Sequence, residues 1–444
     1  MTACIHLSTR PQMRNRAVFH AISGHRAQHR RNQRAAGTGR SWSFPLLALA
    51  LASFPAHAQD APRTTLTNDW WGQGAAMRQA GVDMQLEWRQ YVQGMTKGSG
   101  DVDPAYGSQF SLKTNLDLSK LGFWDGFSLS VQALAKTGYG LNNTGGMLLP
   151  VNAGLFFPGR HGADRYDLAS LFVTQQFSDT VSASFGKFYT VEMARGTPIR
   201  GGVGSDAFWH LQLTAPLSGL IPPQINGAVV SVATQPVSYT LMVFDPKDAT
   251  NRPLFEDLFD SGVNVVGTAT YATKLGGHNG FYSLTGMYST KEGADFSQLV
   301  VPPGTEIGTR DGSWLLGASF QQYLHQDPAN PARGWGVFGE FNVTDGNPNP
   351  MDWSASLGVA GNDMIPGRPD DSFGLGVFHV ATSDALKDEL APYFELEDET
   401  GVEMFYTAAI RPWFHVTLDL QYIDPAPGIA KDGVFVGLGS SLRF

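Results

Sequence analysis

The feature that most constrains this 444-residue chain is a strict alternation of apolar and polar residues that recurs along most of its length. Between Val82 and Val92, alternate positions are almost all apolar, whereas the positions between them carry acids, bases and amides. Successive side chains of a β-strand point to opposite faces, so the pattern predicts a strand with one apolar and one polar face. The last residues, 434–444, repeat the pattern and end on the aromatic Phe444.

About sixteen segments of this kind follow one another and predict an all-β chain. The connections between them alternate loosely between short and long, and the long ones are rich in Gly, Pro, Asn and Asp. Residues 73–80, which precede Gly81, are predicted to form one short helix. The sixteen predicted strands are 82–93, 107–118, 126–137, 166–177, 180–190, 225–234, 237–245, 262–274, 280–290, 313–324, 334–343, 352–360, 372–382, 402–410, 413–423 and 434–444.

Composition excludes several classes of protein. The chain lacks the runs of about 20 apolar residues that a bundle of membrane-spanning helices requires. A net charge of -9 without a basic domain in the body of the chain argues against nucleic-acid binding. An apolar content of 42% is enough to bury a core, which argues against a disordered chain.

The first 58 residues differ from the rest and are interpreted as an export leader. They carry eight arginines and no acid, the first acid being Asp60, and an apolar run from Phe44 to Phe54 follows. Ala56-His57-Ala58 then supplies the small-x-small pattern of a signal peptidase site, which predicts cleavage after Ala58. The mature chain would have 444 − 58 = 386 residues and a charge of −9 − 8 = −17.

Removal of this leader also removes the single cysteine, Cys4. Disulfides and cysteine-bound metals are therefore excluded from the mature chain, and no cofactor is predicted. We divide the chain into the leader 1–58, an N-terminal periplasmic segment 59–81 and a barrel domain 82–444.

Two architectures fit the alternation, because a soluble β-sandwich turns its apolar faces inward whereas a transmembrane barrel turns them toward lipid. The barrel is favoured by export without cysteine and by polar faces rich in Gly, Ser, Thr, Asn and Gln. It is also favoured by the terminal Phe444, which resembles the signal read by the barrel-assembly machinery. Aromatic residues near strand ends would form an interfacial girdle, namely Tyr271, Tyr288, Tyr323, Trp413 and Tyr422.

We therefore predict a transmembrane antiparallel β-barrel of about sixteen strands in the outer membrane. Its long loops would be extracellular and its turns periplasmic, with a short N-terminal helix on the periplasmic side. The proposed partners are outer-membrane lipids and small solutes, and association into a homo-oligomer stays open.

Several short motifs resemble the OprB family of carbohydrate-selective porins. The mature start 66–72 resembles the family's opening DW-G pattern, and 185–188 (FGKF) resembles its internal GK strand. Residues 244–248 (FDPKD) resemble its DPxD segment, and the closing series from Glu403 to Pro425 resembles its E-x-x-Y, PW and D-x-Q-Y-I-x-x-P motifs. The resemblance covers most of the chain from about Leu66 onward, and the order of the motifs is more specific than any one of them.

The resemblance implies a sixteen-stranded outer-membrane barrel, passive diffusion and a preference for sugars. One segment departs from the family's pattern: residues 192–202 (EMARGTPIRGG) do not match what better-known members carry after the GK strand. Direct transfer of a glucose selectivity is therefore not justified.

A pore selective for sugars needs charged and amide groups that replace water around hydroxyls, and apolar surfaces that contact the C–H faces of the ring. Each candidate also has a simpler interpretation as a solvated lumen or loop charge. On the polar faces of the strands, the candidates for the substrate path are Glu87, Arg89, Lys113, Lys136, Lys187 and Glu340. In the loops they are Arg165, Glu192, Arg195, Arg200, Trp209 and His210.

Other functions remain open at this point. A porin without sugar selectivity, either general or carboxylate-preferring, fits the same scaffold. A barrel enzyme would need a hydrolytic set, for which His415, Thr417 and Asp419 share one strand parity, although neither H-E-x-x-H nor G-x-S-x-G occurs. The acidic residues of 363–371 and 395–399 offer oxygen ligands for Ca²⁺, but a solvated surface explains them equally, and no metal site is predicted.

Overall fold

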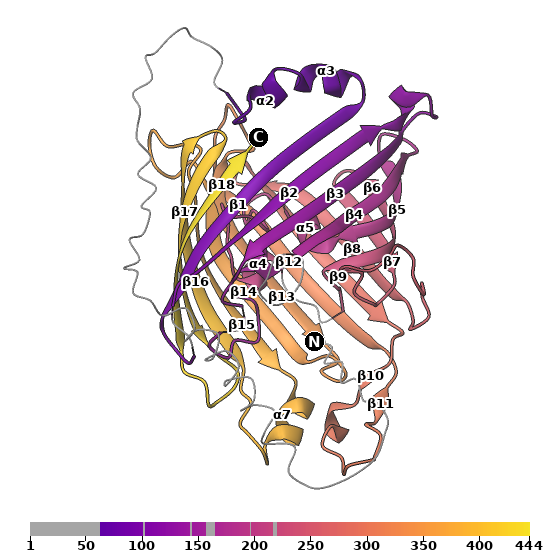
Figure 1. Ribbon diagram of the computed structural model, residues 1–444, viewed down its shortest axis with the longest axis vertical. Helices are drawn as coiled ribbons and strands as arrows, with labels where there is room; N and C mark the ends of the chain where they lie inside the picture. The colour runs from indigo at the N-terminus through magenta and orange to yellow at the C-terminus, as the bar shows by residue number, and fades with distance from the viewer. Residues whose placement is uncertain (1–62, 101–102, 143, 157–164, 196, 216–219) are drawn as a thin grey trace, which may run out of the picture. The chain divides into compact units, whose positions relative to one another are not determined.

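A computed structural model of the protein describes residues 63–100, 103–142, 144–156, 165–195, 197–215 and 220–444. The predicted leader and its cleavage site at Ala58 lie outside these residues. The described chain forms a closed antiparallel barrel of sixteen strands (Figure 1). They are β1 (Val82–Lys97), β2 (Ala105–Asp117), β3 (Phe127–Gly138), β4 (Arg165–Gln176), β5 (Val181–Tyr189), β6 (Gln224–Ala233), β7 (Val237–Phe244), β8 (Asn264–Leu275), β9 (His278–Ser289), β12 (Ser313–Gln326), β13 (Gly334–Thr344), β14 (Met351–Asn362), β15 (Ser372–Thr382), β16 (Glu399–Arg411), β17 (Phe414–Asp424) and β18 (Gly433–Arg443).

The remaining elements are short and do not form part of the barrel wall. They are α2 (Asn68–Trp71), α3 (Gly74–Gln79), η1 (Leu118–Leu121), α4 (Ala153–Phe156), α5 (Thr190–Met193), α6 (Leu211–Thr214), β10 (Gly293–Ala294), η2 (Phe296–Gln298), β11 (Thr309–Arg310) and α7 (Asp384–Leu390). None of the helices in the described part of the chain is long and apolar enough to cross a membrane.

The sixteen predicted strands are confirmed, and their ends agree closely with the structure. The largest difference is in β1, which continues to Lys97 rather than ending near residue 93. The apolar pattern fades there because Gly94 and Thr96 occupy the outward positions, and the pairing with β18 shifts between Met95 and Lys97.

Closure of the barrel depends on the pairing of the first strand with the last. β1 pairs with β18 in an antiparallel register that places Trp88 opposite Leu442 and Glu87 opposite Arg443. No barrel edge is therefore left open. In lipid, where water cannot satisfy backbone groups, this closure provides partners for the N–H and C=O groups of the wall.

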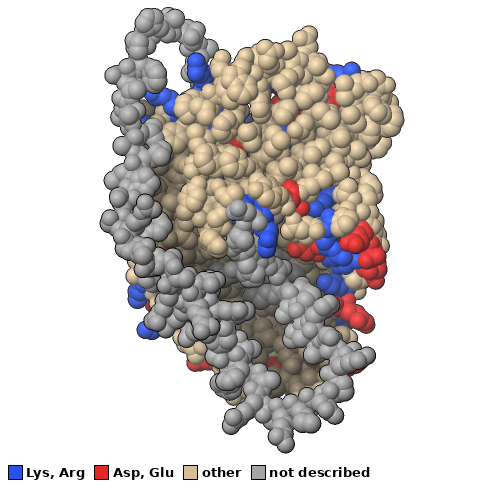
Figure 2. Space-filling view, viewed as in Figure 1, with Lys and Arg blue, Asp and Glu red and all other residues tan. Residues whose placement is uncertain are grey.

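The two faces of the wall differ in polarity, as the alternation predicts. Leu284, Leu357 and Leu418 are each more than half exposed on the outer face. Inward positions of β16 and β17 are polar and buried, as at Glu403 and Gln421. This arrangement inverts that of a soluble protein and excludes the β-sandwich alternative. Figure 2 shows a broad uncharged expanse on the outer wall of the barrel.

The predicted aromatic girdle is confirmed in part. Tyr271, Tyr288 and Tyr422 are each about half exposed on the outside. The assignment of Tyr323 to the girdle is wrong, because it shares the inward parity of Leu315 and is 4% exposed. Its hydroxyl donates a hydrogen bond of 2.8 Å to the Pro198 carbonyl oxygen inside the barrel.

The N-terminal segment lies at the end of the barrel where the first strand begins and the last strand ends. The Leu66 N–H bonds to the Arg443 carbonyl oxygen at 2.7 Å, and the Trp70 indole N–H donates to the Met84 carbonyl oxygen at 3.0 Å. The predicted short helix is present as α3. The strand connections at this end have at most nine residues, and the opposite end carries the longest loops (Figure 1).

Candidate functional site

The loop between β5 and β6, residues 190–223, crosses the lumen of the barrel. Near its start, Arg195 forms an ion pair of 2.7 Å with Glu87 on β1. A few residues later the backbone N–H groups of Ile199 and Arg200 donate to the side-chain oxygen of Gln321 on β12, at 2.9 and 3.2 Å. β12 is seven strand-to-strand steps from β1 in a barrel of sixteen, so these contacts lie on nearly opposite walls.

The crossing lies nearer the end of the barrel where β1 begins, because Glu87 is opposite Arg443, the last residue of β18. Glu87 lies ten residues (97 − 87) from Lys97, the end of β1 at the long loops. At about 3.3 Å per residue this is roughly 33 Å along the strand. The loop therefore narrows the passage well below the barrel rim that carries the long loops, and it forms a constriction.

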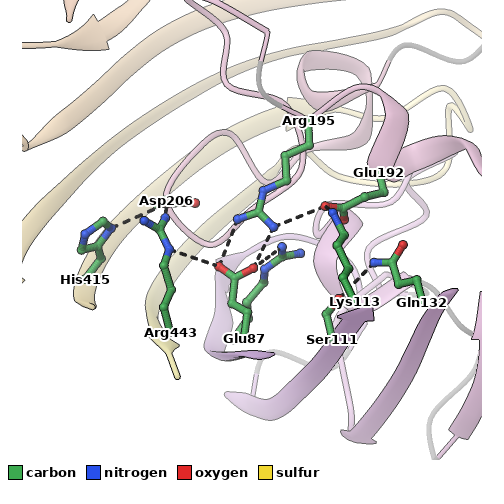
Figure 3. A network of polar contacts seen from close by, with 10 residues as sticks. Glu87, Ser111, Lys113, Gln132, Glu192, Arg195, Asp206, His415 and Arg443 are labelled. Atoms are coloured by element: carbon green, nitrogen blue, oxygen red, sulfur yellow. Dashed lines mark hydrogen bonds and ion pairs between the residues drawn. The ribbon is translucent and has the colours of Figure 1, made fainter. Parts of the chain in front are cut away.

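A network of opposed charges lines one side of this crossing (Figure 3). Glu87 accepts from Arg89 at 2.6 Å and from both terminal nitrogens of Arg195 at 2.7 and 3.1 Å. Arg195 also lies 3.3 Å from Glu192, which pairs in turn with Lys113 on β2. Two wall strands and the loop thus share one chain of ion pairs.

The network continues toward the last strands of the barrel. Asp206, further along the loop, accepts from Arg443 on β18 at 2.8 Å and lies 3.6 Å from the ring of His415 on β17. Arg443 is also 3.9 Å from Glu87, which joins this group to the first. On the far wall a separate pair links Arg200 of the loop to Glu340 on β13 at 3.0 Å.

The loop carboxylates are held in the charged form by these neighbours. Burial disfavours ionisation of Glu192, but the charges of Arg89, Arg195 and Lys113 outweigh it and lower its pKa. The pKa of Asp206 is likewise lowered, because hydrogen bonding to His415 and the charges of Arg443 and Arg195 exceed the opposing effect of burial. At neutral pH the lumen therefore presents fixed, paired charges of both signs.

Two carboxylates of β16 fasten inward-folded loops to the wall. Glu403 accepts the backbone N–H groups of Trp209 and of His210, the latter at 3.0 Å. Four residues earlier, Glu399 accepts those of Leu148 and Leu149, at 2.6 and 3.1 Å, from the loop between β3 and β4. Each carboxylate thus satisfies two consecutive backbone N–H donors.

Trp209 packs into the wall rather than facing the passage. Its indole is 1% exposed and meets the Tyr91 ring edge-on at 5.0 Å between centroids. It rests on Gly437 and Gly439 of β18, where a Cβ atom would overlap the indole ring. Next to it, the His210 ring is fully buried and stacks on Phe378 at 4.1 Å, and burial lowers the pKa of His210 to about 3.

The predicted site residues thus fall into distinct groups. Three of the predicted basic residues lie apart from the network: Lys136 contacts the Leu155 carbonyl oxygen at 3.2 Å, Lys187 lies 3.6 Å from Asp167, and Arg165 is exposed at the start of β4. The charge network brings together Glu87, Arg89, Lys113, Glu192 and Arg195. Arg200 and Glu340 form the separate pair on the far wall. Trp209 and His210 lie in the part of the loop that Glu403 binds.

Sequence reasoning did not select Asp206, Gln321, Glu403 or Arg443, and its interpretation of Glu399 as part of a solvated acidic loop is wrong, because Glu399 is fully buried. The strand residues among them could have been found, because inward parity marks Gln321, Glu403 and Arg443 as lumen-facing. Asp206 had no such signal, since a loop residue acquires its contacts only when the loop folds back. The residues proposed for a hydrolytic set, His415, Thr417 and Asp419, lie on the inner face, and the last two are buried.

Most aromatic rings that point into the described part of the lumen are covered by other side chains and are not available to a solute. Nine inward aromatics of the core clusters are at most 4% exposed, namely Tyr91, Tyr189, Phe208, Trp209, Tyr323, Phe338, Phe378, Phe405 and Phe435. Phe281 on β9, which lies opposite Gln321 and shares its inward face, is only partly buried. Within the same described ranges, no three His, Cys, Asp or Glu side chains are placed to hold a metal ion.

A closed sixteen-stranded barrel with an apolar exterior, a polar interior and a charged loop across its lumen defines an outer-membrane diffusion porin. The chain belongs to the OprB family of carbohydrate-selective porins, whose model matches residues 101–444. It is therefore an outer-membrane channel for carbohydrates that contacts membrane lipids and small solutes, as its fold and family point to a channel rather than an enzyme.

Comparison of the chain with individual known proteins is consistent with this family. Porin B of Pseudomonas aeruginosa is 24% identical over 435 residues, covering 87% of this chain and 92% of the relative. A putative porin, QuiX, of Acinetobacter baylyi is 26% identical over 218 residues, or 42% of this chain and 48% of the relative. The high-pH structure of OprB from Pseudomonas putida has a TM-score of 0.74 at 21% identity, covering 87% of this chain and 100% of that one, which shows a shared fold.

Proposed function

We propose that the channel passes small neutral carbohydrates by passive diffusion and that it selects them where the 190–223 loop crosses the lumen. The observation that carries this proposal is the near balance of charge in the network. Its cations are Arg89, Lys113, Arg195 and Arg443, and its anions are Glu87, Glu192 and Asp206.

Such a network recognises hydroxyl groups because it offers donors and acceptors side by side. A guanidinium has five N–H donors and an ionised carboxylate has about four acceptor sites, so pairing leaves capacity for a solute. A sugar hydroxyl can donate to Glu192 while it accepts from Arg195 or Lys113. The binding must stay weak, because a solute that replaces its water too well does not leave the pore.

The same pairing disfavours anions. A carboxylate-preferring pore requires cations that are not neutralised by neighbours, whereas each cation of this network lies within 4 Å of a carboxylate. An added anion would have to compete with Glu87 or Glu192 at the cost of like-charge repulsion. The general or carboxylate-preferring porin is therefore the alternative that the experiment must exclude.

The test is single-channel recording in planar bilayers with increasing glucose, alongside liposome swelling with sugars and with gluconate. We expect glucose to reduce the ion current and the neutral sugars to swell liposomes faster than gluconate does. Arg195→Gln removes the loop's bond to Glu87 and should weaken the glucose effect severalfold. Arg78→Gln is the matched control, since Arg78 forms a similar pair with Asp69, at 2.7 Å, in the N-terminal segment. A wild-type current that ignores every sugar would refute the proposal.

Export and assembly complete the proposal. Cleavage after Ala58 would leave residues 59–81 as the periplasmic segment of a mature outer-membrane protein, with Phe444 read by the barrel-assembly machinery. The position of Phe444 supports this, because its backbone N–H bonds to the Leu86 carbonyl oxygen at 2.9 Å, at the closing seam of the barrel. N-terminal sequencing of the purified outer-membrane protein tests the cleavage, and a start at Gln59 is expected. Hydrolase assays on the purified protein test the proposed absence of enzyme activity.

A further inference from the structure

The charge network supplies polar contacts for a sugar, but a pyranose ring also has apolar C–H faces. Most of the aromatic side chains that would ordinarily cover such a face are buried in the described lumen, and Phe281 on the wall is only partly buried. One apolar side chain in the crossing loop differs from them. Met193, the last residue of α5, is 47% exposed.

The neighbours of Met193 fix where it lies. Val191 is buried in a cluster with Leu134 and Tyr189, which seats α5 against the inner wall. Glu192 and Arg195 reach the network on β1 and β2. Met193 therefore stands between the two loop residues of the network, inside the lumen, and the water it meets is that of the passage.

Within the described residues of the crossing loop, 190–195, 197–215 and 220–223, Met193 is the only exposed side chain among Met, Leu, Ile, Val, Phe, Tyr and Trp. Leaving such a side chain in water forgoes about 25 cal/mol for each Å² of apolar surface that could be buried. A flexible, polarisable thioether is well suited to cover irregular apolar surfaces of a partner.

We propose that Met193 is a specificity-determining residue that contacts the C–H face of a pyranose while Glu192, Arg195 and Lys113 bond its hydroxyl edge. The substrate class is then a closed-ring sugar, recognised by a polar edge and an apolar face held at adjacent loop positions. An open-chain polyol has the hydroxyls but no fixed apolar face, so it gains nothing from Met193. This inference rests on the proposed function, because it assumes that sugars bind at the loop crossing.

The experiment measures the half-saturating concentration of D-glucose and of D-glucitol from the reduction of single-channel current. Met193→Ala and Met193→Gln should both weaken the effect of glucose about fivefold, as expected for loss of roughly 40 Å² of buried apolar contact. The effect of glucitol should stay within about twofold. Met193→Leu should retain most of the glucose effect, since leucine keeps an apolar side chain of similar volume.

Met404→Ala is the matched control, because Met404 is 50% exposed but faces outward on β16. It should leave both concentrations unchanged. The inference is overturned if Met193→Ala and Met193→Gln keep the wild-type half-saturating concentration of glucose. It is also overturned if the effects of glucose and of glucitol on the current weaken equally, which would indicate a change of pore shape. A wild-type channel on which neither probe acts would instead refute the proposed function itself.

Discussion

Removal of the Glu403 carboxylate should release the crossing loop from the wall. Glu403 is fully buried and accepts the backbone N–H groups of Trp209 and His210. Glu403→Ala leaves two buried donors without their acceptor, at about 1–3 kcal/mol each. The sum is about 2–6 kcal/mol, and even its lower limit shifts the docking equilibrium roughly thirtyfold toward the released loop.

The expected result is a wider and noisier channel in a barrel that still forms. Single-channel conductance should rise and the glucose-dependent reduction of current should weaken, whereas the heat-modifiable gel shift of the folded barrel should persist. Glu403→Gln keeps one acceptor oxygen and should show about half the effect on docking. Glu397→Ala, at an exposed glutamate two residues before β16, is the control. A Glu403→Ala channel with wild-type conductance and wild-type sugar sensitivity would refute the reasoning.

Two further predictions concern the same docked segment. Gly437→Ala places a methyl group against the indole of Trp209 and should raise conductance, whereas Gly267→Ala, where a Cβ meets nothing within 4 Å, should not; equal behaviour of the two variants contradicts the packing argument. Because the folded pKa of His210, about 3, lies below its unfolded value near 6.5, protonation favours release of the segment. Docking should therefore be stable above pH 6.5 and weaken as the pH falls from about 6.5 toward 3, seen as rising conductance. His210→Gln should flatten that rise. An unchanged pH profile in this variant would contradict the assignment of the pH dependence to His210.

The barrel could be predicted from the sequence because lipid leaves the backbone few choices. Alternation shows one apolar face, export without cysteine favours the outer membrane, and a membrane requires every strand to be paired. The same parity placed Glu87, Arg89 and Lys113 on the inner face, where the structure finds them. It failed at Tyr323 only because the residue type was weighed above its position in the strand.

The identity of the constriction could not be predicted in this way. Glu192, Arg195 and Arg200 were chosen as loop charges, yet nothing in their spacing indicates that Arg195 meets β1 while Arg200 meets the nearly opposite wall. Trp209 was expected to face sugars, and it is instead buried on the glycines of β18. These contacts join residues more than a hundred positions apart, so only the path of the loop determines them.

The sequence by itself thus determined the class of fold and the polarity of its two faces, since both follow from local periodicity and the demands of lipid. Only the tertiary structure decided which charges form the pore's narrow region, which side chains anchor the loop and where Met193 is exposed. The physical reason is that a closed barrel places strands that are distant in the chain around one lumen. The residues that a crossing loop contacts therefore depend on its path through the lumen and not on their separation along the chain.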